Sequence, residues 1–140
     1  MRLNKIILSF VSALVILFST SVASFAKVVG DKIILGAAIS LTGKYSSNGV
    51  HTQNGYNMAV DRINSMGGVK VGGKTYKFDI IYYDDESNPK RAAQLAERLI
   101  SQDGVEFMLG PYSSGLTKAI APVTEKSVSY THLRAHETYT

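Results

Sequence analysis

Between residues 32 and 126 the sequence alternates three times between an apolar strand pattern and an amphipathic helix pattern. The first strand pattern is apolar on both faces, which is typical of a strand buried inside a parallel sheet. Consecutive strand–helix units join parallel strands by right-handed crossovers, so the sequence predicts an α/β fold with a doubly wound parallel sheet. The expected strands are residues 32–40, 77–85 and 105–110, and the expected helices are residues 50–66, 89–103 and 113–126.

Local residue types mark the ends of these elements. Ser47 or Asn48 is the expected N-cap of the first helix, and Asn88, which precedes a proline, is the expected N-cap of the second. Pro122 is expected to interrupt or kink the third helix. Residues 69–76, which contain two consecutive glycines, are expected to form a short surface turn.

The first 26 residues have the composition of a signal peptide. A basic start is followed by an apolar run over residues 6–18 and then by Ser24 and Ala26 at the small-residue positions of a cleavage site. The apolar run is shorter than the ~20 residues that a transmembrane helix needs, so we expect cleavage after Ala26 rather than a membrane anchor. The sequence contains no cysteine, which excludes a lipid-anchored cysteine and disulfides. We therefore expect a periplasmic protein that is not a lipoprotein.

The charge pattern argues against a nucleic-acid partner. The whole chain has a formal net charge of +4, but residues 27–127 carry 12 basic and 10 acidic side chains. Nucleic-acid-binding domains concentrate basic side chains on one face or helix, and this segment has no such excess.

Three loops follow the expected strands and would meet at one edge of the sheet, where ligands bind in folds of this type. In the third loop, Ser113 and Ser114 stand at the start of the expected helix, whose free N–H groups and dipole suit a carboxylate. One of these serines could serve only as the N-cap, and spacing alone leaves both interpretations open. In the first loop, Tyr45 and Asn48 could meet a ligand, although Asn48 also fits a helix cap. The loops are residues 41–49, 84–88 and 110–115.

Catalytic and metal-binding interpretations of the remaining polar residues are weaker. Asp84 and Asp85 could hold a divalent cation or belong to a phospho-receiver site, but carboxylates at such a turn more often stabilise the loop. His51 is the single histidine of residues 27–127, and no G-x-S-x-G motif accompanies it. We therefore expect neither an enzyme nor a bound metal or cofactor.

Taken together, four segments resemble the N-terminal lobe of a type 1 periplasmic binding protein, closest to the Leu/Ile/Val-binding protein class of amino-acid ABC transporters. The resemblance covers residues 32–126 and implies a monomeric two-lobed protein that closes around a small amino acid and presents it to an inner-membrane ABC permease. The segments are "LTGKYSSNG", "GYNMAVDRINSMGGV", "IIYYDDESNPKRAAQLAERLI" and "GVEFMLGPYSSGLTKAIAPVTEK".

The resemblance also implies roles for individual residues. Ser114 matches the hydroxyl that binds the ligand carboxylate in the family, with Ser113 and Tyr112 lining the same corner. Asn48 falls where some amino-acid binders have a tyrosine. Ser87 and Ser113 match two positions that a disulfide joins in some relatives.

The end of the sequence departs from the family, which continues into a fourth apolar strand. Residues 128–138, "VSYTHLRAHET", resemble the translation of a transposase-type sequencing adapter, so His132 and His136 are not interpreted as metal ligands. We expect residues 27–127 to be a truncated N-terminal lobe and residues 128–140 to be a non-native tail. The alternatives are a ligand-sensing receptor ectodomain or regulator of the same fold and, from another class, an exported α/β hydrolase.

Overall fold

The computed structural model describes residues 27–127, so the predicted signal peptide of residues 1–26 and the predicted non-native tail of residues 128–140 lie outside the described residues. Among the residues described, no helix has the length and apolar character required to cross a membrane. In chain order the elements are β1 (Val28–Val29), β2 (Lys32–Ile39), α2 (Ser46–Ser65), β3 (Val69–Val71), β4 (Lys74–Asp84), α3 (Pro89–Ser101), β5 (Phe107–Leu109) and α4 (Ser114–Lys126).

The strand β2 lies at the centre of the sheet. Along one edge it pairs in parallel with β4 over its whole length, from Lys32 opposite Lys77 to Ile39 opposite Asp84. Along its other edge it pairs in parallel with β5 and, near its start, antiparallel with β1. The parallel β4–β2–β5 core confirms the predicted sheet.

Two antiparallel additions were not predicted from the sequence. Besides β1, the strand β3 pairs antiparallel with β4, so residues 69–76 form a hairpin rather than only a turn. Gly72 and Gly73 connect its strands with φ angles of +58° and +80°, a conformation that suits glycine and matches the twist of a two-residue hairpin. The strand β4 consequently begins three residues before its predicted start.

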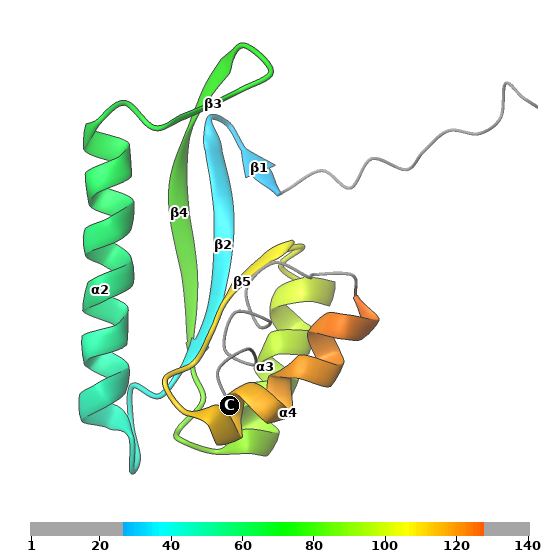
Figure 1. The fold of residues 1–140 in the computed structure, drawn as a ribbon. Helices are drawn as coiled ribbons and strands as arrows, with labels where there is room; N and C mark the ends of the chain where they lie inside the picture. The colour runs from blue at the N-terminus through cyan, green and yellow to red at the C-terminus, as the bar shows by residue number, and fades with distance from the viewer. Residues whose placement is uncertain (1–26, 128–140) are drawn as a thin grey trace, which may run out of the picture.

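Helices cover both faces of the sheet, as a doubly wound fold requires. The helix α2 lies on one side of the strands, whereas α3 and α4 pack against each other on the opposite side (Figure 1). The main core lies between β2, β5 and the α3–α4 pair, and small alanine side chains allow these elements to approach closely. Its buried residues are Ile34, Ala38, Ala92, Ala96, Leu99, Val105, Met108, Leu116 and Ile120.

The helix α2 begins at Ser46, four residues before its predicted start. Tyr45 is its N-cap residue and makes no side-chain capping bond, so the prediction that Ser47 or Asn48 caps this helix is wrong. Gly49, the one buried residue of α2, packs against the end of β2, and this contact fixes where the helix starts. At the other end, Gly67 has φ +98°, the left-handed conformation that commonly ends a helix.

Two further sequence signals concern the start of α3 and the proline inside α4. The Asn88 side chain accepts hydrogen bonds from the backbone N–H groups of Lys90 and Arg91, at 2.9 and 3.2 Å, and so caps α3 as predicted. Pro122 lies inside α4, which continues to Lys126, so the proline does not interrupt the helix; the alternative, that it kinks the helix, stays a prediction. Burial of Ile120 and Thr124 on either side of the proline holds this part of the helix against the core.

Candidate functional site

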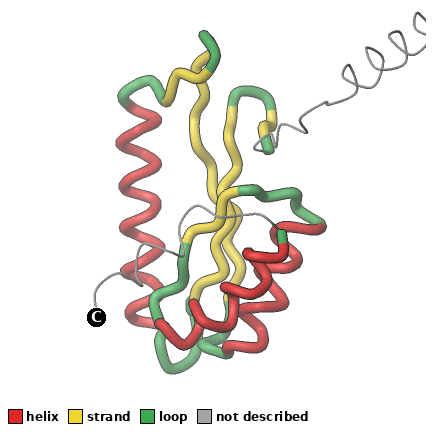
Figure 2. Tube along the Cα trace, turned by 45° about the vertical axis from the view of Figure 1, so that its right-hand side comes forward, coloured by secondary structure: helices red, strands yellow, loops and turns green. Residues whose placement is uncertain are grey.

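The order of the strands creates a switch point at the centre of the sheet. From β2 the chain passes through α2 to β4 on one side, and then through α3 to β5 on the other side of β2. The loops after β2 and β5 therefore diverge from neighbouring strand ends, which is where ligands bind in open α/β sheets. Figure 2 shows the loops that follow β2, β4 and β5 gathered at one end of the sheet, away from the β3–β4 hairpin.

Two predicted site residues meet across this switch point. Tyr45, before α2, and Tyr112, before α4, have ring centroids 6.3 Å apart with an angle of 51° between the ring planes. Tyr45 is partly buried, whereas Tyr112 is 51% exposed. The Lys44 ammonium lies 5.3 Å from the centroid of the Tyr45 ring. The two rings form an aromatic surface shared by two loops that are distant in sequence.

The two serines before α4 have different roles in the structure. The Ser113 hydroxyl accepts a 3.4 Å hydrogen bond from the N–H of Leu116 and caps the helix. Ser114 is the first helical residue, is exposed, and its hydroxyl bonds to no other described residue. The first turn of α4 has no acidic side chain, and Lys126 stands in its last turn. The positive end of this helix therefore keeps free N–H groups and a hydroxyl available for an anion.

Asn48 lies within the first turn of α2, three residues after Tyr45, and is partly buried. Its backbone carbonyl oxygen accepts a 2.9 Å hydrogen bond from the Thr52 hydroxyl. Over residues 27–127 no hydrogen bond joins the Asn48 side chain to the corner before α4. The structure thus brings Tyr45 and Tyr112 together. It places Asn48 in the first turn of α2, and among the described residues no hydrogen bond joins its side chain to Ser114.

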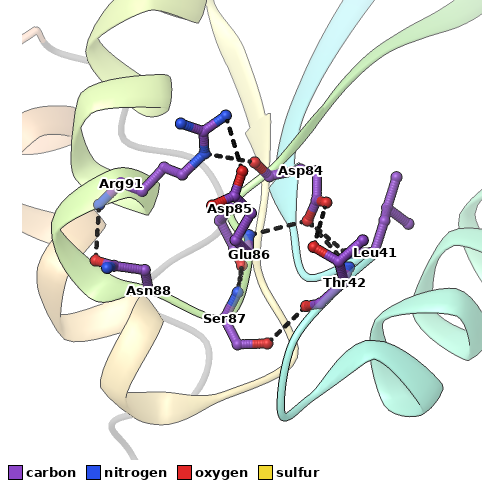
Figure 3. A network of polar contacts seen from close by, with 8 residues as sticks. All are labelled: Leu41, Thr42, Asp84, Asp85, Glu86, Ser87, Asn88 and Arg91. Carbon is purple, nitrogen blue, oxygen red and sulfur yellow. Dashed lines mark hydrogen bonds and ion pairs between the residues drawn. The ribbon is translucent and has the colours of Figure 1, made fainter.

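Asp84 joins the loop after β2 to the end of β4 (Figure 3). Its carboxylate accepts hydrogen bonds from the N–H of Leu41 at 2.9 Å, from the hydroxyl of Thr42 at 2.7 Å and from the N–H of Thr42 at 3.2 Å. A fourth comes from the N–H of Glu86 at 2.9 Å. Partial burial raises the pKa of Asp84, but these bonds outweigh it, so the pKa lies below its ordinary value. The structure confirms the loop-stabilising interpretation of this carboxylate.

Asp85 is fully buried and binds different partners from Asp84. Its Oδ1 accepts hydrogen bonds from the Ser40 hydroxyl at 2.7 Å and from the N–H of Ser87 at 2.8 Å, whereas Oδ2 has no partner among the described residues. Burial raises the pKa of Asp85 above its ordinary value, and the hydrogen bonds from Ser40 and Ser87 oppose that rise only in part. Within residues 27–127, no group of three or more side chains is arranged to hold a metal ion.

Ser87 completes the connection between the first two loops. Its hydroxyl accepts a 2.9 Å hydrogen bond from the N–H of Tyr45 and donates one of 2.8 Å to the carbonyl of Thr42. Ser87 and the preceding Glu86 both have positive φ angles, 59° and 54°, which turn the chain tightly enough for these bonds. The N-cap residue of α2 is therefore held from outside its own helix.

The structure adds one residue, Tyr56 of α2, that the sequence did not single out as a candidate site residue. The hydroxyl of Tyr56, in α2, donates a 2.7 Å hydrogen bond to the carbonyl of Gly110, just before Tyr112. A tyrosine at a half-buried helix position carries a polar tip that needs a partner. That residue type was the available signal, but the sequence could not identify a partner 54 residues away.

Comparison with known proteins gives a consistent result. A family model described as periplasmic binding protein matches residues 32–133. The Leu/Ile/Val-binding protein BraC3 of Rhizobium johnstonii is 34% identical over 109 residues, covering 76% of this chain and 28% of that protein. The leucine-, isoleucine-, valine-, threonine- and alanine-binding protein of Pseudomonas aeruginosa is 30% identical over 107 residues, covering 75% and 27%.

A solved structure resembles the fold as well. The substrate-binding protein LivJ of a branched-chain amino acid transporter from Streptococcus pneumoniae, in complex with isoleucine, superposes with a TM-score of 0.62 at 30% identity. The similarity covers 69% of this chain and 26% of LivJ. The chain thus spans about a quarter of the length of the relatives it matches. The family match overlaps the first residues of the segment predicted to be non-native, whose origin stays a prediction.

Proposed function

Because the chain belongs to the periplasmic binding protein family, we propose that it forms one lobe of a solute-binding protein that captures an amino acid outside the cytoplasm. The solute is a branched-chain amino acid or a similar small carboxylated molecule, and the protein delivers it to an ABC transporter permease. Two relatives are named as proteins that bind leucine, isoleucine and valine, and these names support this class of solute.

The observation that carries this proposal is the environment of Ser114. Among the described residues, the Ser114 hydroxyl at the positive end of α4 and the first N–H groups of that helix have no partner, and the first helical turn has no acidic side chain. Such a group of donors favours a carboxylate through charge-assisted hydrogen bonds. Since Ser113 already caps the helix, Ser114 is not needed for that purpose.

The aromatic pair beside α4 suits the rest of an amino acid. A carboxylate at Ser114 would leave the ligand side chain near Tyr112, whose exposed ring extends the surface begun by Tyr45. Asn48, in the first turn of α2, supplies a polar group at the same end of the sheet. We propose that this lobe contributes five residues, acting by binding alone and without catalysis: Tyr45, Asn48, Tyr112, Ser113 and Ser114.

The rest of the binding surface belongs to a second lobe in this proposal. The chain spans about a quarter of its relatives, so the groups that would bind the ligand ammonium and close over the site lie elsewhere in a longer protein. Export by the leader of residues 1–26 would place that protein, as a soluble monomer, in the periplasm.

Isothermal titration of amino acids into the protein encoded by the complete reading frame tests the proposal. Leucine, isoleucine, valine, alanine and threonine form the panel, and we expect at least one of them to bind. The 140-residue chain alone should show no measurable binding, because one lobe encloses only part of a ligand. A folded full-length protein that binds none of the five amino acids would contradict the proposed function.

A further inference from the structure

We propose that Tyr56 is a positioning residue that fixes the α4 corner, defined as residues 110–114, in the shape that receives the ligand carboxylate. This inference rests on the proposed function, because it assigns a role to a residue that touches no ligand. Its basis is the 2.7 Å hydrogen bond from the Tyr56 hydroxyl to the Gly110 carbonyl. The bond connects the middle of α2 with the end of β5, across the switch point of the sheet.

The α4 corner is well fixed at its helical end. The carbonyl of Ser113 accepts hydrogen bonds from the N–H and the hydroxyl of Thr117, at 2.9 and 3.1 Å, and the Leu116 side chain is fully buried. The strand pairing that fixes its other end extends only to Leu109. Within residues 27–127, Tyr56 is the one side chain from another element that donates a hydrogen bond to the backbone of this corner.

The hydrogen bond from Tyr56 affects the ligand through the position of its acceptor, the Gly110 carbonyl. The Gly110 carbonyl directs the chain into Pro111 and Tyr112, and so sets where Ser114 stands relative to the end of β2. Hydrogen bonds weaken steeply when donor and acceptor are misaligned, so a shifted corner would aim the Ser114 hydroxyl poorly. Burial raises the pKa of Tyr56 above 10.0, which keeps its hydroxyl protonated as a donor at neutral pH.

The chain offers a matched control for this bond. The hydroxyl of Tyr82, in β4, donates a 2.8 Å hydrogen bond to the Asn57 side chain of the same helix α2. Burial raises the pKa of Tyr82 to about 12, so it too is a protonated donor. Tyr56→Phe and Tyr82→Phe each remove one hydroxyl and one hydrogen bond between α2 and another element. Only Tyr56→Phe removes a bond to the α4 corner.

The first test measures amide hydrogen exchange in the 140-residue chain. The N–H groups of Leu116 and Thr117, which bond to Ser113, report whether the corner keeps its shape. Loss of a hydrogen bond of ordinary strength should speed their exchange by about three- to tenfold in Tyr56→Phe, with no such change in Tyr82→Phe. Equal exchange rates in the two variants would overturn the inference.

The second test measures leucine affinity in the complete protein, at a temperature where every variant is folded. Tyr56→Phe should raise the dissociation constant by about three- to tenfold, and Tyr82→Phe should leave it unchanged. In a Ser114→Ala background the effect of Tyr56→Phe should largely disappear, because the two residues act on the same carboxylate. A merely structural role would lower the melting temperature without this coupling, and independent effects would therefore contradict positioning.

The two measurements separate the inference from the proposed function. If the wild-type protein binds none of the amino acids, the proposed function fails, and amide exchange still decides whether Tyr56 holds the corner. If leucine binds and Tyr56→Phe has no effect on its affinity, the positioning role fails while the proposed function stands.

Discussion

Gly49 of α2 packs so closely against Ser40 at the end of β2 that a Cβ atom on Gly49 would lie 1.7 Å from the Ser40 carbonyl oxygen. This contact brings the start of α2 against the sheet edge that carries the proposed site. It also places Tyr45, whose carbonyl accepts the N–H of Gly49 at 2.8 Å, within reach of the Ser87 hydroxyl. The position of the first aromatic ring thus depends on the absence of a side chain four residues later.

Replacing Gly49 with alanine should destabilise the chain by about 2–3 kcal/mol, because backbone must move to admit the methyl group. Gly55→Ala is the control in the same helix, since an added Cβ there meets nothing within 4 Å. Alanine at Gly55 should instead stabilise by about 0.5–1 kcal/mol through helix propensity. Urea unfolding measures both values, and equal effects of the two substitutions would disprove the packing argument.

Ser113→Ala should lower the stability of the chain through loss of the α4 cap. The capping bond is long, at 3.4 Å, so we expect about 0.5–1 kcal/mol, the lower part of the range for N-caps. Thermal unfolding compared with Ser114→Ala checks this prediction. A larger loss of stability in Ser114→Ala than in Ser113→Ala would contradict the assignment of Ser113 as the helix cap.

Ser114→Ala should affect binding rather than folding. Loss of one hydrogen bond to a carboxylate predicts about 1–3 kcal/mol weaker binding of leucine to the complete protein, with little change in its unfolding. Isothermal titration gives the affinity. An unchanged affinity would reduce Ser114 to an ordinary first residue of a helix.

Asp84→Ala should destabilise the chain at neutral pH by about 1–3 kcal/mol, because it leaves the N–H groups of Leu41, Thr42 and Glu86 without their acceptor. The folded-state pKa of Asp84 lies below its unfolded value near 3.8, so its contribution is complete above 3.8 and is lost as pH falls through the folded pKa. The wild type and the variant should therefore converge in stability at acid pH. A difference that stays constant with pH would show that the carboxylate charge is not involved.

Asp85 should give the opposite pH dependence. Burial raises its folded pKa above 3.8, so the folded state holds the proton more tightly and loses stability as pH rises from 3.8 through the folded pKa. Asp85→Asn removes this titration. The free energy of unfolding of the variant should therefore improve relative to the wild type as pH rises through that window, whatever their difference at low pH. Parallel pH profiles would contradict the assignment.

The sequence predicted those parts of the structure that depend on neighbouring residues. Apolar patterns identified the three parallel strands, and Asn88 identified the start of α3, because both signals lie within a few residues. The predicted start of α2 was wrong because the start depends on a contact between Gly49 and Ser40, the residue that follows β2. No local pattern could have predicted that contact.

The same distinction applies to the candidate site. Parallel strand order was enough to predict that the loops of Tyr45 and Tyr112 meet at one edge. The bond between Tyr56 and Gly110 could not be predicted, since it joins residues 54 positions apart and depends on how α2 lies across the sheet. The choice between Ser113 and Ser114 as the cap likewise needed backbone geometry.

The hydrogen bonds of Asp84 and Ser87 hold the backbone of the loops at the sheet edge that carries the proposed site. Apart from the bond between Asp84 and the Thr42 hydroxyl, they act on backbone groups of Leu41, Thr42 and Tyr45, and those groups are the same whatever side chain is attached. The rings of Tyr45 and Tyr112 take no part in these bonds. If the chain has the proposed function, substitutions at the two ring positions would therefore change solute preference while the loops keep their shape.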